Sequence, residues 1–335
     1  MQAGSDWQPT ASTGALKLRA TLLARIRAFF TQPNVLEVDT PALSVAGATD
    51  PALHSFRTET HGPAPAGGSS LYLQTSPEFP MKRLLAAGAG SIYQLCKVFR
   101  DGEAGRYHNP EFTLLEWYRT GYDHFDLMDE VEVLLREVLA DVAPIASVDH
   151  WTYRDLFLEA AGVDPLTDSV AALEAALLCR GISPPAGLAA DDRDAWLDLL
   201  LTHVVEPAMG QGLVFIRDYP ASQAALARLR PGNPPVAARF EVYLDGVELA
   251  NGFYELADAG EQRSRFERDN VRRERQGEAV VDVDERLLAA MTVGLPDCAG
   301  VALGVDRLVM AAGRYDHIAD VICLLYTSDA ADDFD

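Results

Sequence analysis

The segment IYQLCKVFRDGEAGRYHNPEFTLLEWY occupies residues 92–118 of the 335-residue chain and decides the expected fold. Residues 92–99 and 112–118 are rich in apolar and aromatic side chains, whereas the stretch between them is polar and contains Gly102 and Gly105. Two such runs around a glycine-containing stretch are typical of a β-hairpin. The segment therefore predicts a hairpin with a long basic loop.

Helices and strands are mixed on both sides of this hairpin. Extended segments are expected at residues 35–38, 71–73, 213–216 and 240–249, with Asp245-Gly246 as a hairpin turn and residues 61–70 as a surface loop. Helical spacing predicts helices at residues 15–30, 75–88, 126–142, 155–161, 168–179, 191–205 and 261–276, and residues 300–312 should run from a strand into a helix. Because regular βαβ alternation is missing, we expect an α+β fold.

Composition limits the partners and the location. The formal net charge is −22 at pH 7, which argues mildly against RNA as the main partner, although an acidic protein can carry a local basic patch. No apolar run reaches eighteen residues and the first ten residues lack a signal-peptide pattern. We therefore expect a cytoplasmic protein with no membrane partner.

The four cysteines are isolated from one another. Cys96, Cys179 and Cys323 occur in apolar stretches, where a thiol acts as a small hydrophobe. Neither a disulfide framework nor a zinc site is expected.

The loop at residues 100–111 could bind a phosphate. Arg100, Arg106, His108 and Asn109 lie between the two strands, so several donors can converge above the sheet, and guanidinium groups match phosphate oxygens. An exposed, solvated hairpin loop is the alternative.

Two further segments carry charged groups in apolar surroundings. Glu241, Glu248 and Glu255 recur every seven residues around a glycine-containing turn, where a metal on a nucleotide, an ammonium substrate or both would neutralise them; an edge strand with outward glutamates fits equally. Arg307 lies near a helix start, which favours an anion site. A structural pair between Asp306 and Arg307 is the alternative there.

These segments together resemble a known enzyme family. Phe99-Arg100, residues 106–112 and residues 304–307 resemble motifs 2 and 3 of class II aminoacyl-tRNA synthetases, and LEVDTP at residues 36–41 looks like motif 1, whose proline lies at the dimer interface in that family. RYHNPEFTLLEWY and ELANGFYEL resemble the lysyl branch. The resemblance implies an antiparallel sheet flanked by helices over residues 12–322, a helical insertion at about 150–210, and a homodimer.

Within that branch the chain resembles the elongation factor P (R)-β-lysine ligases. WQPTAS, PASQAALA, ELANGF and GVALGVDRLVM match that family, and the chain begins almost at motif 1, so we expect no anticodon-binding domain. Ala302 stands where lysyl-tRNA synthetases generally have glycine, and one methyl is worth about 1 to 3 kcal/mol in discrimination. The resemblance implies that (R)-β-lysine is activated with ATP and Mg²⁺ and passed to a lysine ε-amine of elongation factor P. A tRNA-charging enzyme and a noncatalytic regulatory protein are the alternatives, and tRNA is the less expected partner.

The resemblance also implies roles for individual residues. Arg100 would hold the α-phosphate and Arg307 the γ-phosphate as the catalytic pair, by alignment and electrostatic stabilisation. Glu248 and Glu255 would face the metal. The expected ATP-binding set is Arg100, Asp101, Gly102, Glu103, His108, Asn109, Phe112, Glu248, Leu249, Gly304 and Arg307.

The amino-acid substrate would be recognised by a second set. Glu116 and Tyr118 are two apart on a strand and share a face, although Tyr118 could also be core, and Thr75-x-x-Glu78 also fits a capping box. The expected substrate-binding set is Ser76, Pro77, Glu78, Glu116, Tyr118, Glu255 and Ala302.

Three features depart from the family or lie outside it. Many lysyl-type enzymes have Arg-x-Glu in motif 2, but the third position here is Gly102, so Glu103 or the backbone would replace the adenine contact. Residues 323–335 look like an unrelated tail, as a sequence-assembly artefact would produce. The arginine-rich segment at residues 263–275 is interspersed with acids, which favours a solvated helix face over a docking surface for an acidic partner.

Overall fold

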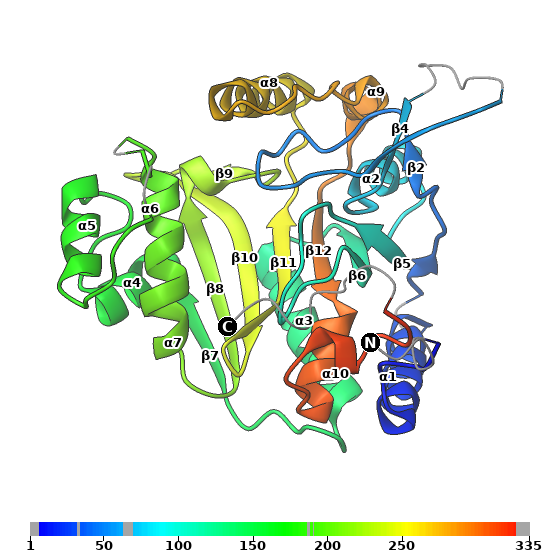
Figure 1. Cartoon of the computed structure of the whole chain (residues 1–335). Helices are drawn as coiled ribbons and strands as arrows, with labels where there is room; N and C mark the ends of the chain where they lie inside the picture. The colour runs from blue at the N-terminus through cyan, green and yellow to red at the C-terminus, as the bar shows by residue number, and fades with distance from the viewer. Residues whose placement is uncertain (1–6, 32–33, 63–69, 186–187, 190, 326–335) are drawn as a thin grey trace.

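The computed structural model describes residues 7–31, 34–62, 70–185, 188–189 and 191–325. Its centre is a mixed sheet with the strand order β1-β5-β6-β12-β11-β10-β8-β7, with β9 paired to β10 (Figure 1). Only the outer pairs β1–β5 and β7–β8 are parallel among the pairings of this sheet in the described residues. The strands are β1 (Leu36–Glu37), β5 (Ile92–Phe99), β6 (Glu111–Thr120), β7 (Val148–Thr152), β8 (Leu213–Pro220), β9 (Leu229–Arg230), β10 (Val236–Leu244), β11 (Val247–Tyr254) and β12 (Cys298–Gly304).

A small second sheet lies beside the first and carries the order β2-β4-β3. Its strands are β2 (Leu43–Ser44), β3 (Arg57–Glu59) and β4 (Ser70–Leu73). The helices are α1 (Thr13–Thr31), α2 (Glu78–Ala86), α3 (His124–Leu139), α4 (Tyr153–Ala161), α5 (Val170–Leu178), α6 (Arg193–Leu200), α7 (Glu206–Ala208), α8 (Ala259–Gln276), α9 (Glu285–Gly294) and α10 (Val305–Gly313).

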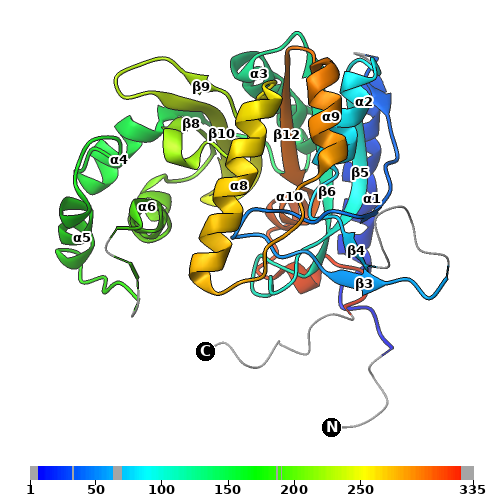
Figure 2. The same cartoon turned by 90° about the horizontal axis from the view of Figure 1, so that it is seen from above.

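The hairpin predicted from residues 92–118 is confirmed and sets the two faces of the sheet. Antiparallel β5 and β6 pair from Ile92↔Tyr118 to Phe99↔Glu111. Since side chains alternate along a strand, Leu115 and Trp117 enter the main core under α1, α3 and α10, whereas Glu116 and Tyr118 point to the other face. That other face bears the candidate site, and α2, α8 and α9 lie over it (Figures 1 and 2).

The predicted α+β class is confirmed, and most expected elements are present. The Asp245-Gly246 turn joins β10 to β11, with positive φ at both residues (52° and 80°), as a type I′ turn requires. Residues 150–210 hold α4 to α7 and a π-helical segment, Leu201–Val205, which pack with β8 in a separate hydrophobic cluster. Residues 63–69 of the expected loop and residues 326–335 of the expected tail lie outside the described residues.

One local expectation and two alternative interpretations are wrong. Cys179 and Cys323 are exposed, as are their apolar neighbours Leu178 and Leu324, and Cys298 is the buried thiol. Helix α2 has Pro77 at its N-cap and no side-chain cap, so Thr75 and Glu78 form no capping box. Asp306 does not pair with Arg307; it contacts Arg19 at 2.6 Å and accepts a hydrogen bond from the Thr113 amide.

No helix in the described part of the chain is long and apolar enough to cross a lipid bilayer.

Candidate active site

A cavity of about 1560 Å³ opens on the face of the sheet opposite the main core. Its floor includes side chains of β6, β11 and β12, and its walls include α2, α6 and α8 (Figure 2). Arg100 also lines it. The cavity therefore reaches Arg100 at the start of the predicted phosphate-binding loop as well as the residues expected to bind the amino acid.

One end of the site, here called the substrate end, consists of Glu78, Lys82, Glu116 and Glu255. Lys82 Nζ lies 2.5 Å from Glu78 Oε1 and 2.6 Å from Glu255 Oε2. The side chains of Lys82 and Glu255 are each only 1% exposed. Two carboxylates thus contact one buried ammonium group, and Glu116 lies near them.

Glu116 is held by two hydroxyl groups. The Tyr118 hydroxyl donates to Glu116 Oε1 and the Ser76 hydroxyl donates to Oε2, both at 2.7 Å. The expectation that Glu116 and Tyr118 share a face is confirmed. Tyr118 is also part of a small apolar cluster with Met81, so it is core and site residue at once.

The substrate end is short of positive charge. Burial, together with the charge of Glu78, raises the pKa of Glu116 to about 7. Burial also raises the pKa of Glu255 to about 8, although Lys82 opposes the shift. Burial alone would lower the pKa of Lys82, but Glu255 and Glu78 outweigh it and the pKa is raised. A further cation at this end would be stabilised strongly.

Strand β12 gives the floor its shape. Gly300 is opposite Tyr118 and Ala302 is opposite Glu116 in the β6–β12 register. A Cβ on Gly300 would come within 2.3 Å of a Tyr118 ring carbon and 2.5 Å of Glu255 Oε1. Glycine is therefore required there by close packing, a role that the sequence alone did not reveal. Ala302, two residues further along β12, also lines the cavity.

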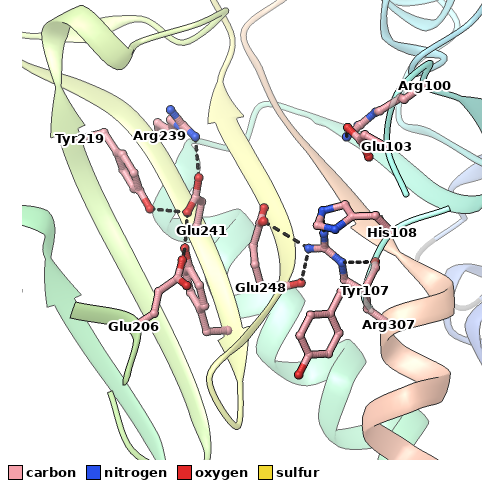
Figure 3. A network of polar contacts seen from close by, with 11 residues as sticks. Arg100, Glu103, Tyr107, His108, Glu206, Tyr219, Arg239, Glu241, Glu248 and Arg307 are labelled. Atoms are coloured by element: carbon pink, nitrogen blue, oxygen red, sulfur yellow. Dashed lines mark hydrogen bonds and ion pairs between the residues drawn. The ribbon is translucent and has the colours of Figure 1, made fainter. Parts of the chain in front are cut away.

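The other end, here called the nucleotide end, consists of Arg100, His108, Glu248 and Arg307. Arg307 donates to the Glu248 carbonyl at 2.8 Å and contacts Glu248 Oε2 at 3.2 Å (Figure 3). Its Nη2 lies 2.7 Å from His108 Nε2. Burial and the charge of Arg307 lower the pKa of His108, so the ring is neutral and can accept from the guanidinium.

Arg100 contacts the hairpin loop and the segment just before α2. Its Nη1 lies 3.4 Å from Glu103 Oε1, its Nε donates to the Thr75 carbonyl at 3.3 Å, and its guanidinium lies 5.0 Å from the centre of the Phe112 ring. Gly102 has a φ of +81°, a conformation that favours glycine. A glutamate at position 102 would be strained in this turn, and Glu103 is the carboxylate that reaches the arginine.

The carboxylates predicted to bind metal do not form one group. Glu248 and Glu255 lie near opposite ends of β11, and seven residues of strand span about 23 Å. Glu255 instead pairs with Lys82, so the structure assigns it to the substrate end and corrects the predicted metal pair. The family resemblance implied Glu248 and Glu255 as the metal pair, but the carboxylate beside Glu248 is Glu241 (Figure 3).

Glu241 belongs to a buried polar network that sequence reasoning described only in part. It accepts hydrogen bonds from the Tyr219 hydroxyl at 2.6 Å, from the Tyr243 hydroxyl at 2.7 Å and from Arg239 at 2.5 Å (Figure 3). The pKa of Glu248 is raised by burial and by the charge of Glu241. The outward-facing edge-strand alternative is wrong, because β10 and β11 are interior strands.

The carboxylates at the nucleotide end can be compared with the ligands that Mg²⁺ requires. No group of three or more His, Cys, Asp or Glu side chains suited to a metal occurs among the described residues. Mg²⁺ on a nucleotide is usually held by one or two carboxylates plus phosphate oxygens. Glu248, which is half-buried beside Glu241, fits that requirement.

The remaining predicted residues surround these groups. Asn109 is buried and donates to the Glu111 carbonyl at 2.6 Å, and Leu249 is in the main core. Asp101 is exposed, and its amide donates to the His54 carbonyl at 2.8 Å. Gly304 is the N-cap residue of α10, one turn from Arg307, and Pro77 is that of α2. Lys82, Arg239 and Gly300 are the site residues that sequence reasoning missed.

The fold and the site agree with a match to a family of known proteins. Residues 6–327 match the family model described as tRNA synthetases class II (D, K and N), so this chain belongs to the class II tRNA synthetase family. Within that family the similar proteins are more narrowly defined.

Several curated relatives carry the name elongation factor P–(R)-β-lysine ligase. The chain is 53% identical to the protein of that name from Vibrio atlanticus over 318 residues, which cover 95% of this chain and 97% of the relative. It is 54% identical to the Vibrio cholerae protein with the same coverage. It is 49% identical to the Pectobacterium atrosepticum protein, covering 96% of this chain and 98% of the relative. The resemblance expected from the motifs is confirmed.

Proposed function

We propose that this chain activates (R)-β-lysine with ATP and transfers it to a lysine ε-amine of elongation factor P. The observation that carries the proposal is the substrate end, where Glu78 and Glu255 share Lys82 and Glu116 is bonded only to the neutral hydroxyls of Tyr118 and Ser76 among the described residues. A β-lysine molecule brings two ammonium groups, which would complete the charge balance. The printed names of the relatives support the same substrate and acceptor.

The reaction has two steps. The β-lysine carboxylate attacks the α-phosphorus of ATP, pyrophosphate leaves, and an acyl-adenylate forms. The acceptor amine then attacks the acyl carbon, AMP leaves with the bonding electrons, the nitrogen loses a proton, and an amide forms. No side-chain nucleophile is required, so catalysis consists of alignment and electrostatic stabilisation.

The residues of the nucleotide end fit the first step. Arg100 would stabilise the charge that develops on the α-phosphate, and Arg307 would bind the γ-phosphate, with the predicted ATP-binding residues around them. Glu248, next to Glu241, would hold Mg²⁺, which supplies charge neutralisation on the phosphates when bound. The Arg307 guanidinium group already has Glu248 and His108 as partners. Binding of the ATP phosphate to Arg307 would therefore replace these contacts.

The residues of the substrate end fit recognition of the diamine. Glu78, Glu116 and Glu255 would bind ammonium groups, with Ser76 and Tyr118 fixing Glu116. Ala302, directly opposite Glu116, would narrow the floor compared with glycine. We propose that this methyl group contributes to the choice of β-lysine over α-lysine.

Pyrophosphate exchange and mass spectrometry test this function. We expect ATP–pyrophosphate exchange with (R)-β-lysine to exceed exchange with α-lysine, and elongation factor P to gain the mass of one lysyl group. Exchange with α-lysine at an equal or higher rate would contradict the substrate. If tRNA were aminoacylated while elongation factor P stayed unmodified, the proposed acceptor would be wrong. Tight ATP binding without pyrophosphate exchange would favour a noncatalytic protein.

We also propose that the protein acts in the cytoplasm as a homodimer formed through the segment at residues 36–41. Strand β1 is at the edge of the sheet, and Leu36 is 56% exposed. An exposed apolar residue on an edge strand is a natural contact for a second copy. Sedimentation of the wild-type chain and of Leu36→Glu tests this, and a monomeric wild-type chain would contradict it.

A further inference from the structure

The helix α8 presents a row of arginines to the cavity. Arg265, Arg268, Arg272 and Arg275 are spaced by three, four and three residues, which places them on one face of a helix. All four line the cavity. We call this set the arginine stripe.

The arginine stripe carries more positive charge than its neighbours neutralise. Arg265 and Arg268 share one carboxylate, Glu261, at 3.0 and 3.4 Å. Arg272 and Arg275 are exposed and have no ion pair or hydrogen bond with any residue that the structure describes. Even with Glu261 and the cavity-lining Asp269 both ionised, two positive charges remain on this wall.

The opposite wall of the cavity has the opposite charge. Asp191, Asp192, Asp194 and Asp198, in and just before α6, line the same cavity, and α6 and α8 lie on opposite sides of it (Figure 2). Asp194 accepts from the Ser222 hydroxyl at 2.6 Å and Asp198 from the Gln223 amide at 2.8 Å, so both are bonded to neutral groups. The cavity therefore has one basic wall and one acidic wall.

The cavity is larger than its small-molecule substrates require. Pockets for small ligands usually measure about 300–1,000 Å³, whereas this cavity measures about 1560 Å³ and extends from the substrate end to α8. Part of this space is available to the acceptor, whose lysine must reach the adenylate.

We propose that the arginine stripe docks an acidic surface that flanks the target lysine of the acceptor protein. A polypeptide with a lysine beside acidic residues matches both walls, because its acids meet the stripe while its lysine passes the aspartates. An RNA backbone would meet repulsion from the acidic wall and from the net charge of −22. This inference rests on the proposed function, since it assumes a protein acceptor.

Charge reversal of the two unpaired arginines tests the proposal. In the double variant Arg272→Glu/Arg275→Glu, we expect transfer of β-lysine to elongation factor P to fall at least about tenfold in kcat/KM, mainly through KM, because charges at the edge of an interface act on association. Transfer by the wild type should weaken with added salt, and transfer by the double variant should depend on salt less. ATP–pyrophosphate exchange without the acceptor should stay within about twofold of wild type, because exchange reports only the first step.

Arg263→Glu is the matched control. Arg263 is on the opposite face of α8, does not line the cavity and pairs with Glu285 at 2.5 Å. Its charge reversal should leave transfer nearly unchanged. Equal transfer rates for the double variant and this control would overturn the proposal, whereas recovery of the double variant with an acceptor whose flanking acids are changed to lysine would support it.

Two further outcomes separate this proposal from the proposed function. If the wild type exchanges pyrophosphate but never modifies elongation factor P, the proposed acceptor fails. If the wild type modifies it and the double variant does so equally well but loses binding to tRNA, then the stripe is an RNA surface and the docking proposal fails.

Discussion

The substrate end and the nucleotide end of the active site balance their charges in different ways. At the substrate end the Lys82 and Glu255 side chains are 1% exposed, and water contributes little to their solvation. At the nucleotide end the Arg307 and Glu248 side chains are 20% and 39% exposed, and water shares in their solvation. The first end is therefore fixed by its internal partners, and the second can exchange its partners for a ligand.

This difference separates stability from function at the level of single residues. Removing one member of a buried ion pair leaves an uncompensated charge, whereas an exposed pair contributes little to folding. We expect substitutions at the substrate end to change the free energy of unfolding, and substitutions at the nucleotide end to change ATP-dependent steps alone.

The largest effect is expected for Lys82→Met, which leaves the buried Glu255 and the partly exposed Glu78 without their cation. Above pH 8, where Glu255 is ionised, the free energy of unfolding should fall by about 3–5 kcal/mol, measured by urea denaturation. Lys97→Met is the control, because Lys97 pairs with Glu111 at 3.4 Å on the surface and should cost less than about 1 kcal/mol. Equal losses for the two variants would remove the distinction between the two ends.

A smaller loss is expected for Gly300→Ala. The added Cβ would overlap Tyr118 and Glu255, and overpacking of this kind costs about 1–3 kcal/mol. Because both displaced groups belong to the substrate end, pyrophosphate exchange should fall far more than stability does. Gly14→Ala is the control, since its Cβ would meet no atom closer than 3.6 Å. Unchanged exchange in Gly300→Ala would show that the floor is not closely packed against the substrate carboxylates.

The dependence of stability on pH should also originate at the substrate end. The pKa of Glu255 is raised from 4.5 to about 8 in the folded state, so the folded protein binds a proton that the unfolded chain releases. Stability should therefore decrease as the pH rises from about 4.5 to 8, with a slope of at most about 1.4 kcal/mol per pH unit for one proton. Glu255→Gln should flatten this decrease, measured by urea denaturation at several pH values. An unchanged slope would mean that Glu255 is ionised throughout.

The two ends also differ in how far the sequence predicted them. Arg100, His108 and Arg307 were expected from loop composition and from motif resemblance, because phosphate sites use backbone positions near turns and helix starts. Lys82 was missed, since a lysine four residues after Glu78 is typical of an ordinary surface pair, and only the packing of α2 on the sheet shows that Lys82 is buried.

The same limit applies to the fold. The β5–β6 hairpin and the Asp245-Gly246 turn followed from local pattern, since both depend on neighbouring residues. The partners of Glu241 and Glu255 depend on which strands lie side by side, and periodicity along one strand does not contain that information. The need for glycine at position 300 likewise arises from Tyr118 on a strand distant in the sequence.

The smallest effect on stability is expected for Glu248→Gln at the nucleotide end. The substitution keeps the shape of the side chain and removes one charge from a pair that is partly in water, so the free energy of unfolding should change by less than about 1 kcal/mol. Pyrophosphate exchange should nevertheless fall strongly, because the proposed metal ligand is lost while Arg307 keeps its bond to the Glu248 carbonyl. Glu248→Asp, which retains the charge, should recover part of the exchange at raised Mg²⁺ concentration. A large loss of stability in Glu248→Gln would place Glu248 with the buried charges of Lys82 and Glu255, and the contrast between the two ends would then be wrong.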